Sequence, residues 1–474
     1  MKPTDVLIAG AGPAGSLLAT MLCRDGFAVT LLERSQPRQH MPEETIPAAA
    51  GPVVERLGLA PLFAREKFFG TPRRGVCWSP GGTPEISCTN LTPAERGFKV
   101  VREVLDRELR VMAVGAGAHI LDATVLSIDA AAQNVRLRLT TGKEQVLTAP
   151  VVVNALGARG ARLSASVQEG FPDTLALTCC IDNAGADADI TVVEAVRAGW
   201  LWWMPRSIGG SVLTLMADAG EVKSIGAKSI FESACRSAIG PARHVRSGCD
   251  TGTRATPELF APTGGILHCG DAAAGIDPLS SQGLLKAMLS AERTAAAVRT
   301  LLATPTLRRS VEEHLQAFHA GAWRIHAQET LDWYRREQRF ADAPFWKARH
   351  TLQARYAPVT VSLPTMFVRR ARLVPAPLLV CEQGMLRERT GYLSPHTNEP
   401  YHQVGPISVD QLLRMTELPG RFEDVCRRAL AVQGMSLHSE GELRTVLSEA
   451  FRLGFVESFR AELPRAPSAQ HTMQ

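Results

Sequence analysis

The chain has 474 residues, a formal net charge of +5 and 45% hydrophobic residues. This length exceeds one average domain, so two or three structural units are expected. The small net charge argues against a nucleic-acid partner. We find no signal peptide and no apolar run of roughly 18 residues that could span a bilayer, which predicts a cytoplasmic protein without a membrane partner. The ten cysteines form no CxxC pair or metal-ligand spacing, so we predict reduced thiols and no metal site.

The first 33 residues predict a strand, a glycine-rich turn, a helix and a second strand. An apolar run over 5–9 is typical of a buried parallel strand. Leucine and methionine then recur at helical spacing over 17–22, until Asp25 and Gly26 end the helix. The second strand is predicted over 28–32 and leads into Glu33.

The turn between the first strand and the helix matches a dinucleotide-binding loop. Gly10 permits the tight turn, Gly12 lets the backbone approach a diphosphate, and Gly15 allows close helix–strand packing. The helix N-terminus stabilises phosphate charge. Glu33 follows Gly10 by 23 residues, and it would accept hydrogen bonds from ribose hydroxyls. The alternative is a glycine-rich turn without a ligand. The predicted binding residues are Gly10, Gly12, Pro13, Ala14, Gly15, Glu33 and Arg34.

A second match lies far along the chain, where a short apolar run ends in Gly270-Asp271-Ala272 and Asp277-Pro278 leads through Gly283 into a helix. It resembles the second flavin motif of the FAD monooxygenases. In that family the Asp contacts the ribityl chain, and the helix N-terminus stabilises negative charge on reduced flavin. An ordinary helix N-cap is the alternative for Asp271. The resemblance implies FAD-binding residues at Gly270, Asp271, Pro278, Ser281, Gln282 and Gly283.

Two further segments resemble the same family. The stretch from Val101 to Ala113 is similar to its arginine-containing helix, which implies that Arg102 lies near the flavin. The alternative is a surface arginine on an amphipathic helix. Residues 151–157 are similar to the strand that leads back to the dinucleotide fold. The matches span most of the chain and imply an α/β, FAD-binding, Rossmann-like fold of the para-hydroxybenzoate hydroxylase and halogenase type.

Two features are similar to the flavoproteins that resemble tryptophan halogenases. Residues 44–47 match part of a Gly-Glu-Ser-x-Pro-Pro stretch, which implies that Thr45 is a cofactor-binding residue, although Glu43 and Ala48 depart from the pattern. Residues 200–205 fit Trp-x-Trp-x-Ile-Pro, with Met in place of Ile. The resemblance predicts that Trp200 and Trp202 form the wall of the catalytic site. A core strand with aromatic packing on both faces is the alternative.

A third feature points away from halogenation. Halogenases carry a lysine shortly before a tryptophan-containing strand, where it directs hypohalous acid to the substrate. The corresponding segment here is residues 69–78, and it contains no lysine. Lys67 is the nearest, eleven residues before Trp78, and that spacing is too long for the halogenase pattern.

Three segments, 279–283, 337–340 and 344–346, resemble one subgroup of these flavoproteins. Its members mature tryptophan-derived quinone cofactors in amine dehydrogenases and amino-acid oxidases by hydroxylating a tryptophan side chain in a protein. The sequence thus predicts an FAD-dependent monooxygenase acting on an aromatic ring, including an indole within a protein subunit. An FADH2-dependent halogenase and a non-catalytic FAD-binding maturation factor are the alternatives. We find no second dinucleotide motif, so electrons should come from a separate flavin reductase or from loosely bound NAD(P)H.

The expected organisation has four parts, the last of which contains helix candidates over 408–415, 422–432 and 442–453 after a linker over 390–406. These parts are a discontinuous FAD-binding domain over 1–165 and 255–300, a substrate-facing sheet over 166–254, a helical region over 301–390, and a small helical domain over 391–474 ending in a disordered tail.

Basic residues predominate over 333–374, which predicts either a solvated face or a surface that docks an acidic partner. The basic residues are Arg335, Arg336, Arg339, Lys347, Arg349, Arg355, Arg369, Arg370 and Arg372.

Overall fold

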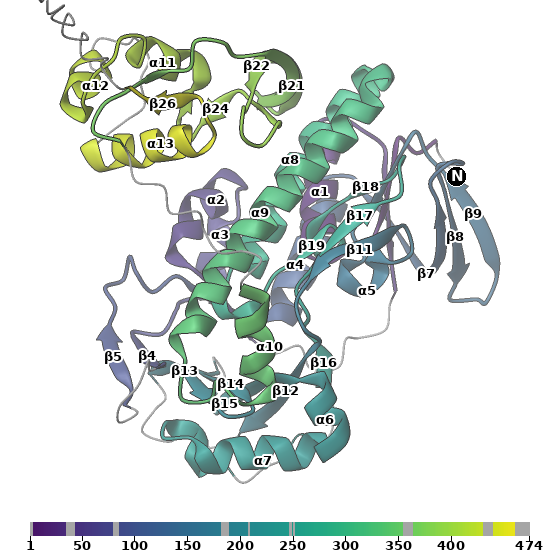
Figure 1. Cartoon of the computed structure of the whole chain (residues 1–474). Helices are drawn as coiled ribbons and strands as arrows, with labels where there is room; N and C mark the ends of the chain where they lie inside the picture. Colours follow the sequence, from purple (N-terminus) through teal and green to yellow (C-terminus); the bar gives the residue numbers. More distant parts are fainter. Residues whose placement is uncertain are drawn as a thin grey trace, which may run out of the picture. The chain divides into compact units, whose positions relative to one another are not determined.

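Figure 1 shows the whole chain, which divides into two compact units. The first contains Met1–Ala357 and Gln383–Met385, and the second contains Pro358–Glu382 and Leu386–Gln474. The computed structural model describes residues 3–34, 43–78, 85–181, 189–206, 209–245, 249, 252–353, 364–429 and 439–459. Within these ranges, no helix is long and apolar enough to cross a membrane.

A seven-stranded sheet carries the dinucleotide loop. In spatial order its strands are β18 (Leu267–His268), β10 (Val151–Asn154), β1 (Val6–Ala9), β2 (Val29–Glu33), β7 (His119–Asp129), β8 (Asn134–Leu139) and β9 (Glu144–Thr148). The first five pair in parallel, and β7 to β9 continue as an antiparallel meander. Every residue of β1 and β10 is buried, as expected for parallel strands covered on both faces.

The three longer helices that accompany this sheet are α1 (Pro13–Arg24), α4 (Arg102–Gly115) and α8 (Gly283–Ala303). Helix α1 packs against both α4 and α8, and it ends at Asp25 and Gly26 as the sequence predicts. Strand β3 (Glu44–Ile46) pairs with β6 (Phe98–Val100), just before α4. The shorter helices are α2 (Gly51–Arg56), α3 (Ala60–Arg65) and α5 (Gly157–Ala161).

A second seven-stranded sheet contains the tryptophan motif. In spatial order its strands are β16 (Gly252–Arg254), β12 (Thr174–Ile181), β15 (Ser211–Asp218), β14 (Gly199–Pro205), β13 (Ile190–Val196), β4 (Arg73–Cys77) and β5 (Ser87–Asn90). Strands β12 to β16 lie within residues 166–254, where the sequence predicts a substrate-facing sheet. The expected boundary at residue 165 does not separate the two sheets, because β4 pairs in parallel with β13 and brings an earlier segment into the second sheet.

Helices cover both faces of this second sheet (Figure 1). Helices α6 (Ala219–Ile225) and α7 (Ala227–Ser237) lie on one face, and α9 (Arg308–Arg336) and α10 (Pro344–Gln353) on the other. Side chains alternate along a strand, so Trp203 of β14 joins the apolar cluster on the α7 side. Trp200 and Trp202 face the opposite way and join the cluster on the α9 side.

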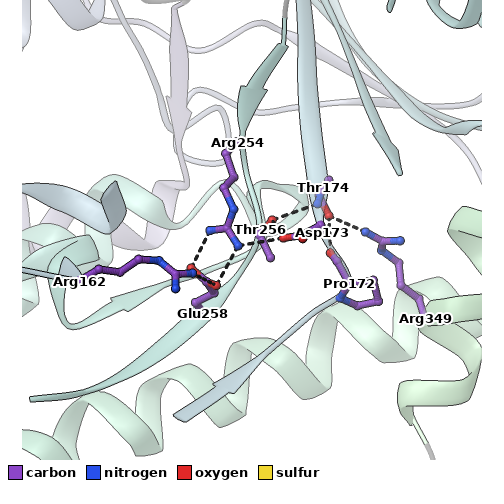
Figure 2. Close-up of polar contacts among 8 residues, drawn as sticks. All are labelled: Arg162, Pro172, Asp173, Thr174, Arg254, Thr256, Glu258 and Arg349. Carbon is purple, nitrogen blue, oxygen red and sulfur yellow. Dashed lines mark hydrogen bonds and ion pairs between the residues drawn. The ribbon is translucent and has the colours of Figure 1, made fainter. Parts of the chain in front are cut away.

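Two chain crossings connect the second sheet to a small sheet of β11 (Ala165–Gly170), β17 (Glu258–Pro262) and β19 (Ala274–Gly275). Figure 2 shows the polar clamp that ties these crossings together. The nearly buried Glu258 carboxylate accepts hydrogen bonds from Arg254 at 2.6 and 2.8 Å and from Arg162 at 2.8 Å. Arg254 also donates to Asp173 at 2.9 Å. Both crossings are therefore held by the same charges.

The second unit mixes helices and strands. Helices α11 (Val409–Met415), α12 (Phe422–Ala429) and α13 (Glu440–Arg452) confirm the three helix candidates within the described residues, and positions 430–432 of the second candidate lie outside those residues. The expectation of a helical region to residue 390 and a linker over 390–406 is wrong in part, because strands occupy much of residues 367–404. These strands are β20 (Phe367–Arg369), β21 (Pro375–Glu382), β22 (Met385–Leu393), β23 (Pro400–Tyr401) and β24 (Gln403–Val404). Strands β25 (Ile407–Ser408) and β26 (Val456–Ser458) follow later in the chain. The predicted disordered tail lies outside the described residues.

The clamp predicts a measurable loss of stability in Glu258→Gln. Replacing the carboxylate with an amide leaves two arginines without their shared anion, and the partial exposure of those arginines moderates the cost. We expect the free energy of unfolding, measured by urea denaturation, to fall by about 1–2 kcal/mol. Glu144→Gln is the matched control, because the Arg138–Glu144 pair is exposed and its loss should cost less than about 1 kcal/mol. Equal losses in the two variants would contradict the clamp.

Candidate functional site

The glycine-rich turn between β1 and α1 has the geometry that the sequence predicts. Gly10 has a φ of +108°, and a Cβ there would lie 2.4 Å from the carbonyl oxygen of Ala155 on the β10 side. A Cβ on Gly15 would lie 1.9 Å from the carbonyl oxygen of Gly10. Only glycine permits these approaches. Gly12 differs, because its φ of −71° is one that any residue adopts, so the backbone conformation does not explain a glycine at this position.

The acidic residue at the end of β2 lies against the glycine-rich turn. Strand β2 pairs in parallel with β1, so both strands end at the same edge of the sheet. The Glu33 Oε2 atom accepts a hydrogen bond from the backbone N–H of Ala11 at 2.6 Å. Arg34 follows in an exposed position. The predicted ribose-binding carboxylate is thus placed beside the predicted diphosphate loop.

The second flavin motif contacts the first one directly. Gly270 has a φ of +67°, and a Cβ there would lie 2.8 Å from the Ala14 Cβ. The Gly270 N–H donates to Ser290 Oγ of α8 at 2.7 Å. Asp271 is on a one-turn helix (Gly270–Ala272), and its side chain is about half exposed, at 54%. The fold therefore joins two motifs that are far apart in the sequence.

Lys286 is a functional candidate that the sequence analysis missed. Its side chain on α8 is buried, and its Nζ lies 2.5 Å from Asp271 Oδ1 and also contacts the Ala274 carbonyl oxygen. A single charge in the apolar run from Leu284 to Met288 is the signal that could have indicated it, since lysine is almost never fully buried without a partner. Lys286 orients the carboxylate that the family resemblance assigns to the flavin ribityl chain.

His268 holds the turn that carries Asp271. Its Nε2 lies 2.9 Å from Ser164 Oγ and its Nδ1 lies 2.9 Å from the Ala272 carbonyl oxygen. Burial lowers the pKa of His268 to about 4, so the ring is neutral near pH 7 and serves as a hydrogen-bonding support.

The flavin loop, residues 277–283, ends at the N-terminus of α8. Pro278 begins a 3-10 turn, and Ser281 adopts the left-handed conformation with a φ of +53°. Gln282 is the N-cap residue of α8, and Gly283 is its first residue. No atom lies within 4 Å of the position that a Gly283 Cβ would occupy, so the start of this helix is open.

The residues present fit FAD. Within the described ranges, no side chain caps the N-terminus of either α1 or α8. Helix N-termini carry partial positive charge and free N–H groups, which suit anions. The α1 end, with Gly12 and Glu33, fits the diphosphate and ribose, and the α8 end, with Asp271 nearby, fits the flavin. Bound FAD would supply the redox chemistry.

Arg102 is buried, so the alternative of a surface arginine is wrong. Its guanidinium pairs with Glu44 of β3 and with Asp106, the latter at 3.3 Å. These contacts fasten α4 to β3, where Thr45 lies opposite Lys99 of β6. The proximity of Arg102 and Thr45 to the flavin stays a prediction.

Lys99 is the second lysine that the sequence analysis missed. Its Nζ donates to the carbonyl oxygen of Pro205, the last residue of the tryptophan strand β14, at 2.9 Å. Burial lowers the pKa of the Lys99 amine. The halogenase lysine precedes the tryptophan-containing strand in the sequence, whereas Lys99 follows Trp78 and reaches β14 through its contact with Pro205.

The two tryptophans predicted to line the site differ in exposure. Trp200 is 1% exposed, whereas Trp202 is half-buried. Both join an aromatic-rich cluster that includes Trp323 and also takes in Ala274, Ile276 and Leu279 around the flavin loop. We call the Trp200–Trp202 side of β14 the tryptophan face. It adjoins the flavin loop, and Trp202 keeps more exposed surface than Trp200. Contact of Trp202 with a substrate stays a prediction.

The basic stretch over 333–374 does not form one docking face. Arg349 is fully buried, and Arg339 is held by Glu337 at 2.6 Å. Arg355 lies outside the described residues. Arg369, Arg370 and Arg372 belong to the second unit. The arginines that lie close together in this part of the sequence are therefore found in several different environments.

Comparison with known proteins identifies the domain that these residues build. Residues 3–215 match the FAD binding domain family. Tryptophan 2-halogenase of Chondromyces crocatus is 25% identical over 372 residues, covering 73% of this chain and 70% of that protein. Digeranylgeranylglycerophospholipid reductase of Methanocaldococcus jannaschii is 25% identical over 299 residues, covering 60% of this chain and 74% of the reductase.

Solved structures agree at the level of the fold. A peptidyl tryptophan dihydroxylase essential for tryptophylquinone cofactor biogenesis superposes with a TM-score of 0.68 and 21% identity, covering 95% of this chain and 99% of that one. A flavin-dependent halogenase superposes with a TM-score of 0.75 and 18% identity, covering 97% of both chains. This protein therefore has an FAD-binding domain, FAD as its cofactor, and the mixed α/β fold of flavin-dependent halogenases and hydroxylases.

Proposed function

We propose that this chain is an FAD-dependent monooxygenase that hydroxylates an aromatic ring, with the indole of tryptophan, including one within a protein, as the preferred substrate class. The observation that carries the proposal is the tryptophan face, which adjoins the flavin loop and leaves Trp202 half-buried. Aromatic rings pack favourably on one another, edge to face or offset, so Trp202 suits a ring substrate.

Each part of the site has a role in this reaction. FAD held by these residues would, once reduced, supply the electrons that activate O2 for transfer of one oxygen atom. The N-terminus of α8 and the cation of Lys286 stabilise negative charge at the flavin end of the site. The apolar cluster around Trp202 would exclude water, which favours loss of the activated oxygen as hydrogen peroxide before it reaches the substrate. We assign no general base, because an electron-rich indole needs little activation.

Two comparisons support a tryptophan substrate, since one relative is named as a tryptophan halogenase and one fold neighbour as a peptidyl tryptophan dihydroxylase. A protein-bound indole is the finer proposal. Its partners would be the protein that presents the indole and a flavin reductase that supplies electrons.

Halogenation is the second candidate, and Lys99 is the observation that favours it. Halogenation needs a compact cation to hold hypohalous acid, and a lysine ammonium meets that need better than a guanidinium. Strand β4 offers only Arg73, which pairs with Asp189 at 3.3 Å, and Arg74, which is exposed. Lys99 is instead half-buried at the end of the tryptophan strand. A halogenase assignment for this chain would therefore rest on Lys99, not on Lys67.

Gly12→Val should abolish FAD binding. The backbone at Gly12 tolerates a side chain, so the added methyl groups act by occupying the space of the diphosphate. Equilibrium dialysis against FAD measures the affinity, and circular dichroism confirms folding. Gly115→Val is the control, because Gly115 lies at the end of α4 with open space around it, and FAD affinity should be unchanged. Full FAD affinity in Gly12→Val would show that the diphosphate lies elsewhere.

The oxygen balance of the product separates hydroxylation from halogenation. With 18O2, reduced FAD and a tryptophan-containing peptide, we expect the product to gain labelled oxygen, in a yield independent of bromide. Mass spectrometry measures both outcomes. Lys67→Ala should change the product yield less than about twofold, because Lys67 is exposed and surface substitutions have small effects. If the wild type forms a brominated product and Lys99→Met does not, the reaction is halogenation and not hydroxylation. A product reduced without oxygen would place the chain with the lipid reductases, and no product from reduced enzyme would favour a maturation factor.

Electrons should reach FAD without a dedicated nicotinamide site. The sequence contains one dinucleotide motif, and FAD occupies it. Isothermal titration with NADPH should therefore show no saturable binding with a dissociation constant below about 1 mM, which corresponds to weak affinity. Saturable micromolar binding of NADPH would contradict the need for a separate reductase.

A further inference from the structure

Two hydrogen bonds in series join the tryptophan face to the flavin loop. The indole Nε1–H of Trp200 donates to Tyr334 Oη of α9 at 3.1 Å. The Tyr334 hydroxyl donates to Asp277 Oδ2 at 2.7 Å. The other carboxylate oxygen of Asp277 accepts the backbone N–H of Leu279 at 3.0 Å. Trp200, Tyr334 and Asp277 are all buried.

The chemistry of the groups fixes the direction of this chain. An indole N–H can only donate, so the tyrosine hydroxyl accepts from Trp200 and has one proton left for Asp277. Burial raises the pKa of the Tyr334 hydroxyl well above its usual value, so the proton stays on the tyrosine. Asp277 can then only accept from Tyr334. A hydrogen bond to a carboxylate in a low-dielectric interior is stronger than a neutral one in water.

A buried arginine supports the same carboxylate. The Arg349 guanidinium of α10 is 5.6 Å from the centre of the Tyr334 ring and donates to Thr174 Oγ1 at 2.5 Å (Figure 2). Burial raises the pKa of the Asp277 carboxyl, and the charge of Arg349 opposes that rise. Asp277 is thus held by a hydroxyl and a backbone N–H, and the charge of Arg349 acts on it electrostatically.

Helix α9 donates hydrogen bonds to residues 275–277 from two side chains, Tyr334 and Trp323. Besides Tyr334, Trp323 Nε1 donates to the Gly275 carbonyl oxygen at 3.0 Å. The Tyr334 ring is stacked beside Trp78, with ring centres 6.1 Å apart and planes inclined by 23°. Packing therefore fixes the ring of Tyr334. The Tyr334 hydroxyl is the group that connects Trp200 of β14 to Asp277.

We infer that Tyr334 is a positioning residue that holds the flavin loop in register with the tryptophan face, through Trp200 on one side and Asp277 on the other. Asp277 directly precedes Pro278, and α8 begins at Gly283, so the carboxylate anchors the segment that leads to the helix N-terminus. The inference rests on the proposed role of the flavin loop in binding FAD, and on no particular substrate.

Tyr334→Phe tests the inference, because it removes the hydroxyl and keeps the ring. We expect the dissociation constant for FAD to rise roughly tenfold, as expected for loss of a hydrogen bond to a charged group. Tyr392→Phe is the matched control, since Tyr392 donates to Asp410 at 3.0 Å in the other unit, and it should leave FAD affinity unchanged. A Tyr334→Phe variant with lower thermal stability but wild-type FAD affinity would overturn the inference.

A double-mutant cycle tests the serial arrangement. Trp200→Phe should weaken FAD binding less than Tyr334→Phe does, because the bond between Tyr334 and Asp277 survives. The double variant should bind FAD as Tyr334→Phe does, since the indole reaches Asp277 only through the hydroxyl. Additive effects on the FAD dissociation constant would overturn the serial chain. Failure of the wild type to add labelled oxygen would instead refute the proposed function and leave these FAD measurements standing.

Discussion

Close backbone approach at three glycines is the constraint on which the site depends. Gly10, Gly15 and Gly270 each lie where a Cβ would meet a neighbouring atom at 2.8 Å or less. Without side chains at these points, β1, α1 and β10 pack directly on one another, and the turn after β18 reaches Ala14. The N-termini of α1 and α8 are then set within one domain as two positive, uncapped ends suited to a long anionic cofactor. Gly12 differs, because its extended backbone conformation is open to any residue, and its role beside the diphosphate stays a prediction.

The relation between the two sheets depends on a second set of contacts. The Glu258 clamp ties both chain crossings with charge, and α9 spans from the second sheet to the flavin loop through Trp323 and Tyr334. Charged and aromatic contacts thus both support this junction. In the proposed function the loop holds a flavin against a substrate-binding sheet, and that role needs such fixed supports, because small misplacements of reacting groups cost large factors in rate.

The similar proteins are named for three different reactions: halogenation, hydroxylation of a peptidyl tryptophan and reduction of a lipid. Residues that hold a dinucleotide cannot separate these reactions, since they act on the cofactor and not on the substrate. In our proposal the distinction lies in the groups at the tryptophan face, where Trp202 is half-buried and the amine of Lys99 lies at the end of the strand. The choice between hydroxylation and halogenation therefore depends on whether these groups direct the activated oxygen to the aromatic ring or to a halide ion.

The sequence alone determined the dinucleotide unit, the flavin loop and the strands of the second sheet, because strand periodicity, glycine spacing and helix stops act over short distances. It misjudged the second unit, where short strands carry a weak pattern, and it missed Lys286, Lys99 and Tyr334. Each of those three matters through a partner distant in the sequence: Asp271, Pro205 and Asp277. Likewise, a count of arginines could not reveal that Arg349 is buried. Only the tertiary structure decided these roles, because hydrogen bonds and burial depend on distance in space.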